Sequence, residues 1–441
     1  MILLCFLWFA VLYLLAFKAS KDNDLLSPIK FVSVKYAVLN LPFIFIIWYS
    51  PVTFKKAILR VCNVTLNDAF WQYTKVQTVA FLSLVSGIYV YNKWMRLKPG
   101  WVVNTDIYNY RALKTTALLF FSIAFGAYSV FIYRIGGLYY LLTHLDNRIE
   151  LQSGQYILQL LNFLYIAILL LMLCVRLSNK TSDKVIFFVA LLSACFIFSS
   201  FGARKNTLVL IVMVVFSYHY MIKRISFSTI NKPLALLLIA LLSGYILLIP
   251  VVRNKEKFAQ LQTEKKSDYI SVYALVYNVS YTYIDIFAAN YFNEKNAWHL
   301  AGITDPVKVF TTKGDKAAVP PVDEGAYFWN IVKNQRDYRP STPRGEMSGG
   351  SWPIENFGFG YANFLLPGII AAFLLQGMCF AFFYGILKKE IYNPVLIYGY
   401  VLVMLSFNFS NLRLVQVATT LPLALFCYGI LYVIRKKNAT A

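Results

Sequence analysis

The sequence predicts an all-α polytopic membrane protein with about 11 transmembrane helices and one long extracytoplasmic loop between helices 8 and 9. The first observation is composition: of 441 residues, 59% are hydrophobic and the mean hydropathy is +0.58, which is outside the range of soluble globular proteins. The second is that apolar runs of roughly 17 to 22 residues recur along the chain, the length that crosses a hydrocarbon core of about 30 Å.

The runs are expected in chain order at residues 1–17, 31–49, 76–91, 112–133, 154–175, 185–202, 206–222, 233–252, 361–387, 391–409 and 414–434. The first run has no charged segment before it and no small-residue cleavage site, so we expect a retained helix rather than a signal peptide. Residues 1–252 then carry helices 1–8. Residues 253–360 form the extracytoplasmic (periplasmic) loop, which includes an amphipathic helix, and residues 361–441 carry helices 9–11 and a cytoplasmic tail.

Charge orients these helices, because short cytoplasmic loops of membrane proteins are rich in Lys and Arg. Basic short loops follow the first, third, fifth, seventh, ninth and eleventh runs. This bias predicts an N-terminus outside, a C-terminus inside and a long loop that faces outward. The segment 50–75 falls outside on this scheme despite its basic residues, which runs against the rule. The net charge of +22 is therefore explained by orientation signals, and no nucleic-acid partner is expected.

The loop 253–360 concentrates the acidic residues of the chain. It holds 12 of the 20 Asp and Glu against 13 of the 42 Lys and Arg, a net charge of +1, whereas the rest carries +21. The eleven predicted runs contain no acid, and ion-coupled transporters usually bury acids in their spans. This pattern disfavours a coupled transporter and favours chemistry at the outer membrane face.

Arginines at outer helix ends and in the loop are candidates for binding a diphosphate. A guanidinium makes bidentate bonds to phosphate, and a helix N-terminus adds amide donors. The six candidates are Arg204, Arg253, Arg336, Arg339, Arg344 and Arg413. Each taken singly is also compatible with a snorkelling or solvated side chain.

Acid–base candidates also lie in the loop. The catalytic candidates are His299, Glu346 and Glu355, with Asp305, Asp323, Glu324 and Asp337 as alternatives that sequence does not separate. Tyrosines recur every fourth residue before Asp285, and Tyr273, Tyr277 and Tyr281 are candidates for contacting a sugar or lipid, the alternative being a membrane aromatic belt. The loop lacks DxD and HExxH spacings, so neither a metal nor another cofactor is expected.

Two short motifs stand out on the predicted outer face. One is Gly202-Ala-Arg204, and the other is Gly349-Gly-Ser-Trp-Pro followed by Gly360-Tyr-Ala-Asn-Phe-Leu-Leu-Pro-Gly368. They resemble a Gly-Ser/Ala-Arg turn and a Gly-rich stretch entering a helix in bacterial oligosaccharide repeat-unit polymerases of the O-antigen polymerase (Wzy-type) family. An acid often precedes the tyrosine of this second motif, and here Phe359 stands in its place.

The resemblance implies a metal-independent GT-C-like glycosyltransferase of the bacterial cytoplasmic (inner) membrane. It would polymerise undecaprenyl-diphosphate-linked repeat units into a surface polysaccharide such as O-antigen, the polymer of lipopolysaccharide, or capsule. A chain-length regulator and a flippase are possible partners. The alternatives are an O-antigen ligase or other polyprenyl-phosphate-dependent transferase, a lipid-linked oligosaccharide flippase, and a structural scaffold.

Overall fold

The computed structural model describes residues 1–49, 53–95, 108–145, 147–152, 155–202, 204–226, 233, 237, 240–246, 249, 281–301 and 317–435. Its named elements in this part of the chain are all helices. The chain divides into two compact units. Unit 1 comprises Met1–Lys98, Asp268–Phe382 and Ser406–Ala418, and unit 2 comprises Pro99–Ser267, Phe383–Leu405 and Thr419–Ala441.

Eight helices within the described residues are long and apolar enough to cross a membrane, which confirms the prediction of a polytopic membrane protein. They are Ile2–Ala19, Pro28–Tyr49, Tyr110–Arg134, Tyr156–Ser178, Thr181–Ser200, Arg204–Ile222, Asn356–Lys389 and Arg413–Ile434. The predicted run 76–91 lies within α4 (Leu66–Trp94), which is not among these eight. The predicted run 391–409 forms the shorter α18 (Pro394–Ser406), and most of the run 233–252 lies outside the described residues. The count of eleven therefore stays a prediction.

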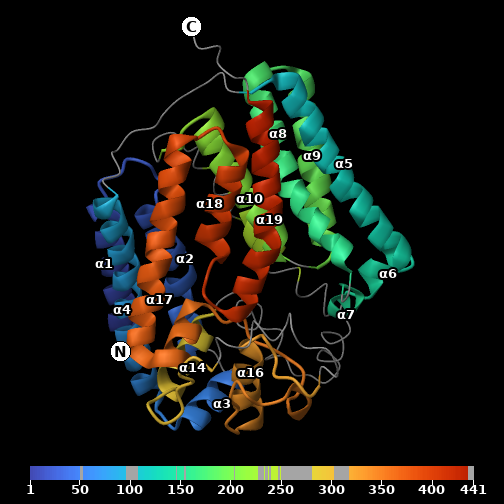
Figure 1. The fold of residues 1–441 in the computed structure, drawn as a ribbon. Helices are drawn as coiled ribbons and strands as arrows, with labels where there is room; N and C mark the ends of the chain where they lie inside the picture. Colours follow the sequence, from blue (N-terminus) through green and yellow to red (C-terminus); the bar gives the residue numbers. More distant parts are fainter. Residues whose placement is uncertain are drawn as a thin grey trace. The chain divides into compact units, whose positions relative to one another are not determined.

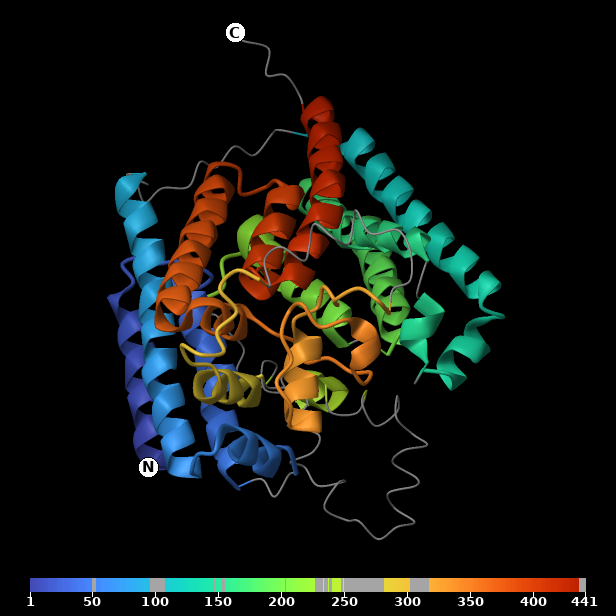
Figure 2. The same cartoon turned by 60° about the horizontal axis from the view of Figure 1, so that its bottom comes forward.

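Unit 1 contains α1 (Ile2–Ala19), α2 (Pro28–Tyr49), α4 (Leu66–Trp94) and α17 (Asn356–Lys389) up to Phe382. Three short helices gather at one end of this unit, and Figure 2 turns that end forward (Figures 1 and 2). They are α3 (Thr53–Cys62), α14 (Thr282–Tyr291) and α16 (Gly325–Asn334). Helix α3 packs against both α14 and α16, and α14 also packs against α2 and α4.

The segment 50–75, expected as an outside loop, contains helical structure. Helix α3 carries Lys55, Lys56 and Arg60 on an amphipathic helix whose Ile58 is buried. Thr65 then caps α4, accepting from the Asp68 N–H. Three of the four basic residues of this segment therefore belong to a helix that packs on the long loop, and the fourth, Lys75, lies on α4.

Glycine lets α4 and α17 approach closely within unit 1. A Cβ at Gly87 would lie 2.1 Å from the Leu374 carbonyl oxygen, and one at Gly377 would lie 2.1 Å from the Leu84 carbonyl oxygen. Small residues at such contacts let backbones of membrane helices meet. Helix α17 is also interrupted near its start, because Phe364 and Leu365 have non-helical backbone angles (φ −140° and +54°).

Unit 2 is built around α8 (Asn162–Ser178), which packs between α5 (Tyr110–Arg134) and α9 (Thr181–Ser200). Its other elements are α6 (Leu138–Thr143), α7 (Arg148–Gln152), η1 (Tyr156–Leu161), α10 (Arg204–Ser217), η2 (Tyr218–Ile222), α18, the end of α17 and most of α19 (Asn411–Ile434). The Lys114 Nζ–Asp183 Oδ1 ion pair, 2.7 Å long, joins α5 to α9.

Candidate functional site

Hydrogen bonds hold the Gly-rich stretch, residues 348–353, against α16. The Ser348 N–H donates to Asn330 Oδ1 at 2.8 Å, and the Trp352 N–H donates to the Gly325 carbonyl at 3.1 Å. A Cβ at Gly325 would lie 1.7 Å from the Trp352 carbonyl oxygen. Only glycine permits this approach at that position, so the stretch and the helix are fitted to each other.

Trp352 connects this stretch to α14. Its ring lies 5.2 Å from that of Tyr283 and 5.9 Å from that of Phe287, and it is 6.1 Å from the ring of Trp329 on α16. Gly350 has φ of +127°, and a Cβ there would lie 2.5 Å from Trp329 Nε1. The aromatic contacts therefore bring α14, α16 and the Gly-rich stretch together.

Two acidic residues interact electrostatically where this stretch enters α17. Asp285 lies on α14, and Glu355 immediately precedes α17. Burial raises the pKa of Asp285 well above its usual range, and the negative charge of Glu355 adds to this effect. Tyr36 is within electrostatic reach of both carboxyl groups, and Tyr13 and Tyr73 are within reach of Asp285. A carboxyl group whose pKa is raised in this way, as that of Asp285 is, can exchange a proton with a substrate hydroxyl.

A third acid, Asp323, is within electrostatic reach of two of the predicted arginines. Its Oδ1 accepts from the Gly325 N–H at 3.0 Å, and its Oδ2 accepts from Ser351 Oγ at 2.6 Å. Burial raises the pKa of Asp323, although these hydrogen bonds and the charges of Arg413 and Arg344 act in the opposite direction. Of the six predicted arginines, Arg344 and Arg413 therefore act electrostatically on one carboxylate.

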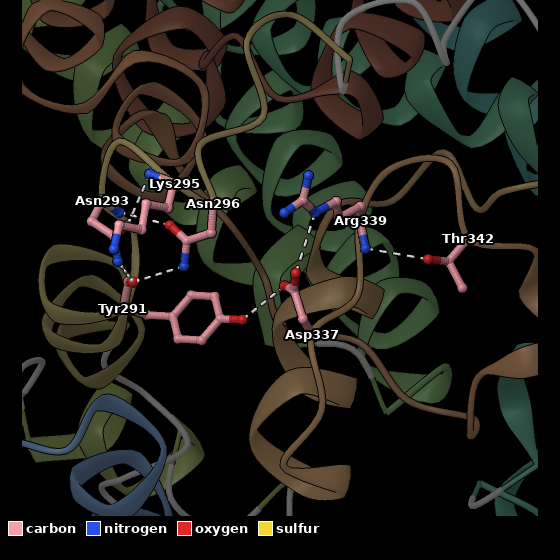
Figure 3. A network of polar contacts seen from close by, with 7 residues as sticks. All are labelled: Tyr291, Asn293, Lys295, Asn296, Asp337, Arg339 and Thr342. Carbon is pink, nitrogen blue, oxygen red and sulfur yellow. Dashed lines mark hydrogen bonds and ion pairs between the residues drawn. The ribbon is translucent and has the colours of Figure 1, made fainter.

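Arg336 and Arg339 are both exposed. Figure 3 shows Arg339 beside Asp337. Arg339 Nε forms an ion pair of 3.2 Å with Asp337 Oδ2, and the Tyr291 hydroxyl donates to Asp337 Oδ1 at 2.8 Å. The Arg339 N–H donates to Thr342 Oγ1 at 3.2 Å. The Asp337–Arg339 pair thus joins α14 to the loop after α16, and exposed pairs of this kind contribute little stability.

His299 and Glu346 are both exposed. The His299 N–H donates to the Asn363 carbonyl at 3.1 Å, beside the interruption of α17. His299 has a left-handed backbone, with φ of +46°. Glu346 ends the short helix η4 (Arg344–Glu346). Of the three predicted catalytic residues, Glu355 interacts electrostatically with a second carboxyl group, that of Asp285.

Arg204 lies in unit 2, at the start of α10. Its Nη1 donates to the Ile246 carbonyl at 2.8 Å. Gly202 turns the chain with φ of +61°, and its carbonyl accepts from Arg148 Nη1 at 2.8 Å. A second arginine, Arg148, therefore stabilises the predicted turn. Arg148 was not predicted as a site residue, because it lies in a loop without net charge.

The remaining predicted residues are distributed as follows. Tyr281 is the N-cap residue of α14 and is exposed. Arg253, Tyr273 and Tyr277 lie outside the described residues. Within the described part of the chain, no group of three His, Cys, Asp or Glu side chains is placed to hold a metal ion.

No family model, curated protein or solved structure matches this chain. The functional interpretation therefore depends on the sequence pattern and on the geometry of unit 1. Asp285 is the clearest residue that sequence reasoning did not select, although it continues the tyrosine stripe that was noted.

Proposed function

We propose that the chain is a glycosyltransferase that polymerises undecaprenyl-diphosphate-linked repeat units at the outer face of the bacterial cytoplasmic membrane. The observation that carries this proposal is the pairing of Asp285 with Glu355. A polytopic membrane protein with a proton-exchanging carboxyl pair, reached by the Gly-rich stretch that resembles the polymerase family, has the groups that glycosyl transfer needs.

In the proposed reaction, Glu355 is the general base. The hydroxyl oxygen of the acceptor sugar attacks the anomeric carbon of the donor glycan, and its proton passes to Glu355. The bond between that carbon and the diphosphate oxygen breaks, and undecaprenyl diphosphate leaves. Asp285 holds a proton beside the base, since its raised pKa keeps it neutral at a pH where an exposed Asp is ionised.

Arginines stabilise the charge that develops on the leaving diphosphate. Arg344 and Arg413 are favoured for this role because both act on one carboxylate, Asp323, in the unit that holds the carboxyl pair. The roles of Arg204 and Arg253 stay predictions from the resemblance. A polymerase is favoured over an O-antigen ligase by that resemblance alone, since the two reactions share the donor chemistry.

The test is a reaction in vitro. Purified full-length protein is incubated with a synthetic undecaprenyl-diphosphate repeat unit and a chelator, and the products are separated on a gel. A ladder of lengths is expected. Unchanged substrate across a panel of repeat units would contradict the proposal. Transfer only to an added lipid A-type acceptor would instead identify a ligase.

A further inference from the structure

Three helix N-termini meet in unit 1 and form a junction. Helix α16 begins after Glu324, α17 begins at Asn356 and α19 begins at Asn411. Glu324 Oε1 accepts from the Asn411 N–H at 2.8 Å, so it joins the start of α16 to that of α19. Asn356 Oδ1 accepts from the Phe409 N–H at 2.7 Å, which joins the start of α17 to the turn before α19. We call this meeting point the N-terminal junction.

The side-chain nitrogen of Asn356, Nδ2, indicates that a ligand binds at the junction. The side chain is 1% exposed, and among the residues that the structure describes nothing accepts a hydrogen bond from its Nδ2. A buried donor without an acceptor is costly, and native proteins rarely keep one without a reason. Because Oδ1 of the same planar amide is fixed to the Phe409 N–H, Nδ2 is held at the junction.

The electrostatics of the junction favour an anionic acceptor for this donor. Helix N-termini carry partial positive charge and bind phosphate groups. Arg413 lies in the first turn of α19, and with Arg344 it acts on Asp323, the residue before Glu324. Glu324 is a hydrogen-bond acceptor, since it accepts from the Asn411 N–H of α19. The groups proposed to donate to the ligand are therefore Asn356, Arg344 and Arg413.

We propose that the N-terminal junction binds the diphosphate of the lipid-linked glycan, with Asn356 Nδ2 donating to a phosphate oxygen. Arg344 and Arg413 supply the positive charge, and the carboxylate of Asp323 balances it in the absence of the diphosphate. The identity of the ligand rests on the proposed function. The preference of the site for a diphosphate follows from its donors and charges.

Asn356→Asp tests this directly. The carboxylate keeps the oxygen that accepts from Phe409 and replaces the Nδ2 donor with a negatively charged oxygen. Asn408→Asp is the matched control, because Asn408 is equally buried in the same turn and its Oδ1 accepts from the Ser410 N–H and Oγ. That variant adds the same charge and keeps both bonds.

Binding is measured on the purified full-length protein with inorganic diphosphate, farnesyl diphosphate and farnesyl monophosphate. We expect the wild type to bind the diphosphates more tightly than the monophosphate. Asn356→Asp should weaken diphosphate binding by about 10-fold or more, the loss that accompanies a hydrogen bond to a charged group. Asn408→Asp should weaken it by less, since the amide nitrogen that it removes is not one of the donors proposed to bind the diphosphate. Tighter binding of the farnesyl form than of inorganic diphosphate would identify a lipid diphosphate as the ligand.

Equal losses in the two variants would overturn the proposal, because long-range charge would then explain both. Wild-type affinity in Asn356→Asp would overturn it as well. If Asn356→Asp does not fold, Arg413→Gln replaces it: weaker diphosphate binding is expected, and unchanged affinity refutes the site. A wild type that binds diphosphate but makes no polymer would contradict the proposed function alone.

Discussion

From the close contact between α4 and α17, we expect small substitutions at this contact to destabilise unit 1. Alanine at Gly87 or Gly377 would place a Cβ 2.1 Å from a backbone oxygen of the facing helix. Real Cβ atoms stay about 3 Å or more from such oxygens, so the helices must separate by about 1 Å. The neighbouring side chains then lose packing contacts along the whole crossing.

We expect each substitution to lower the free energy of unfolding by about 1–3 kcal/mol, the usual cost of overpacking. This loss exceeds the gain of about 1 kcal/mol that alanine brings to a helix over glycine. Since both residues serve one contact, Gly87→Ala with Gly377→Ala should cost less than the two single losses added together.

Thermal unfolding of the detergent-solubilised protein measures this effect. Gly126→Ala in α5 is the control, because nothing lies within 4 Å of a Cβ built there. It should leave the midpoint unchanged or raise it. Gly87→Ala and Gly377→Ala variants as stable as Gly126→Ala would refute the close approach of α4 and α17.

Two further predictions concern buried charge. Because the pKa of Asp285 is raised on folding, the unfolded chain loses that proton first, and the free energy of unfolding falls with rising pH by up to about 1.4 kcal/mol per pH unit. The Asp285→Asn variant should therefore have the same melting temperature as the wild type below the ordinary pKa of Asp, and a higher one at neutral pH. A constant difference between the two melting temperatures from pH 4 to 8 would contradict this. In unit 2, Lys114→Met should destabilise by about 3–5 kcal/mol, because Asp183 is 1% exposed and would lose its ionic partner. Asp183→Asn should cost less, since the Lys114 side chain is 27% exposed and can reach water; equal losses in chemical denaturation would show that this asymmetry is absent.

The long apolar runs were predictable from sequence because span length follows from membrane thickness. The start of α4 was not. Asp68, Gln72 and Lys75 lower the hydropathy before residue 76, yet Phe70 and Tyr73 share a buried face there. Helix α3 was missed for a related reason, since a ten-residue amphipathic helix is too short to register as a span.

The candidate site was only partly predictable. Glu355, Arg344 and Arg413 were selected because their residue types and positions suit diphosphate chemistry. The pairing of Glu355 with Asp285, and that of both arginines with Asp323, depend on contacts between segments far apart in the chain. Asn356 carried no sequence signal, because its importance comes from an amide nitrogen that has no acceptor among the described residues, which only the packed structure shows.

The most direct test of the central claim compares Glu355→Gln with the wild type in the polymerisation reaction. Glu294→Gln, which changes an exposed glutamate of the same loop, serves as the control. We expect a ladder from the wild type and from Glu294→Gln, and unreacted repeat units from Glu355→Gln with its farnesyl diphosphate binding intact. A full ladder from Glu355→Gln would contradict the assignment of the base and of the carboxyl pair as the catalytic centre.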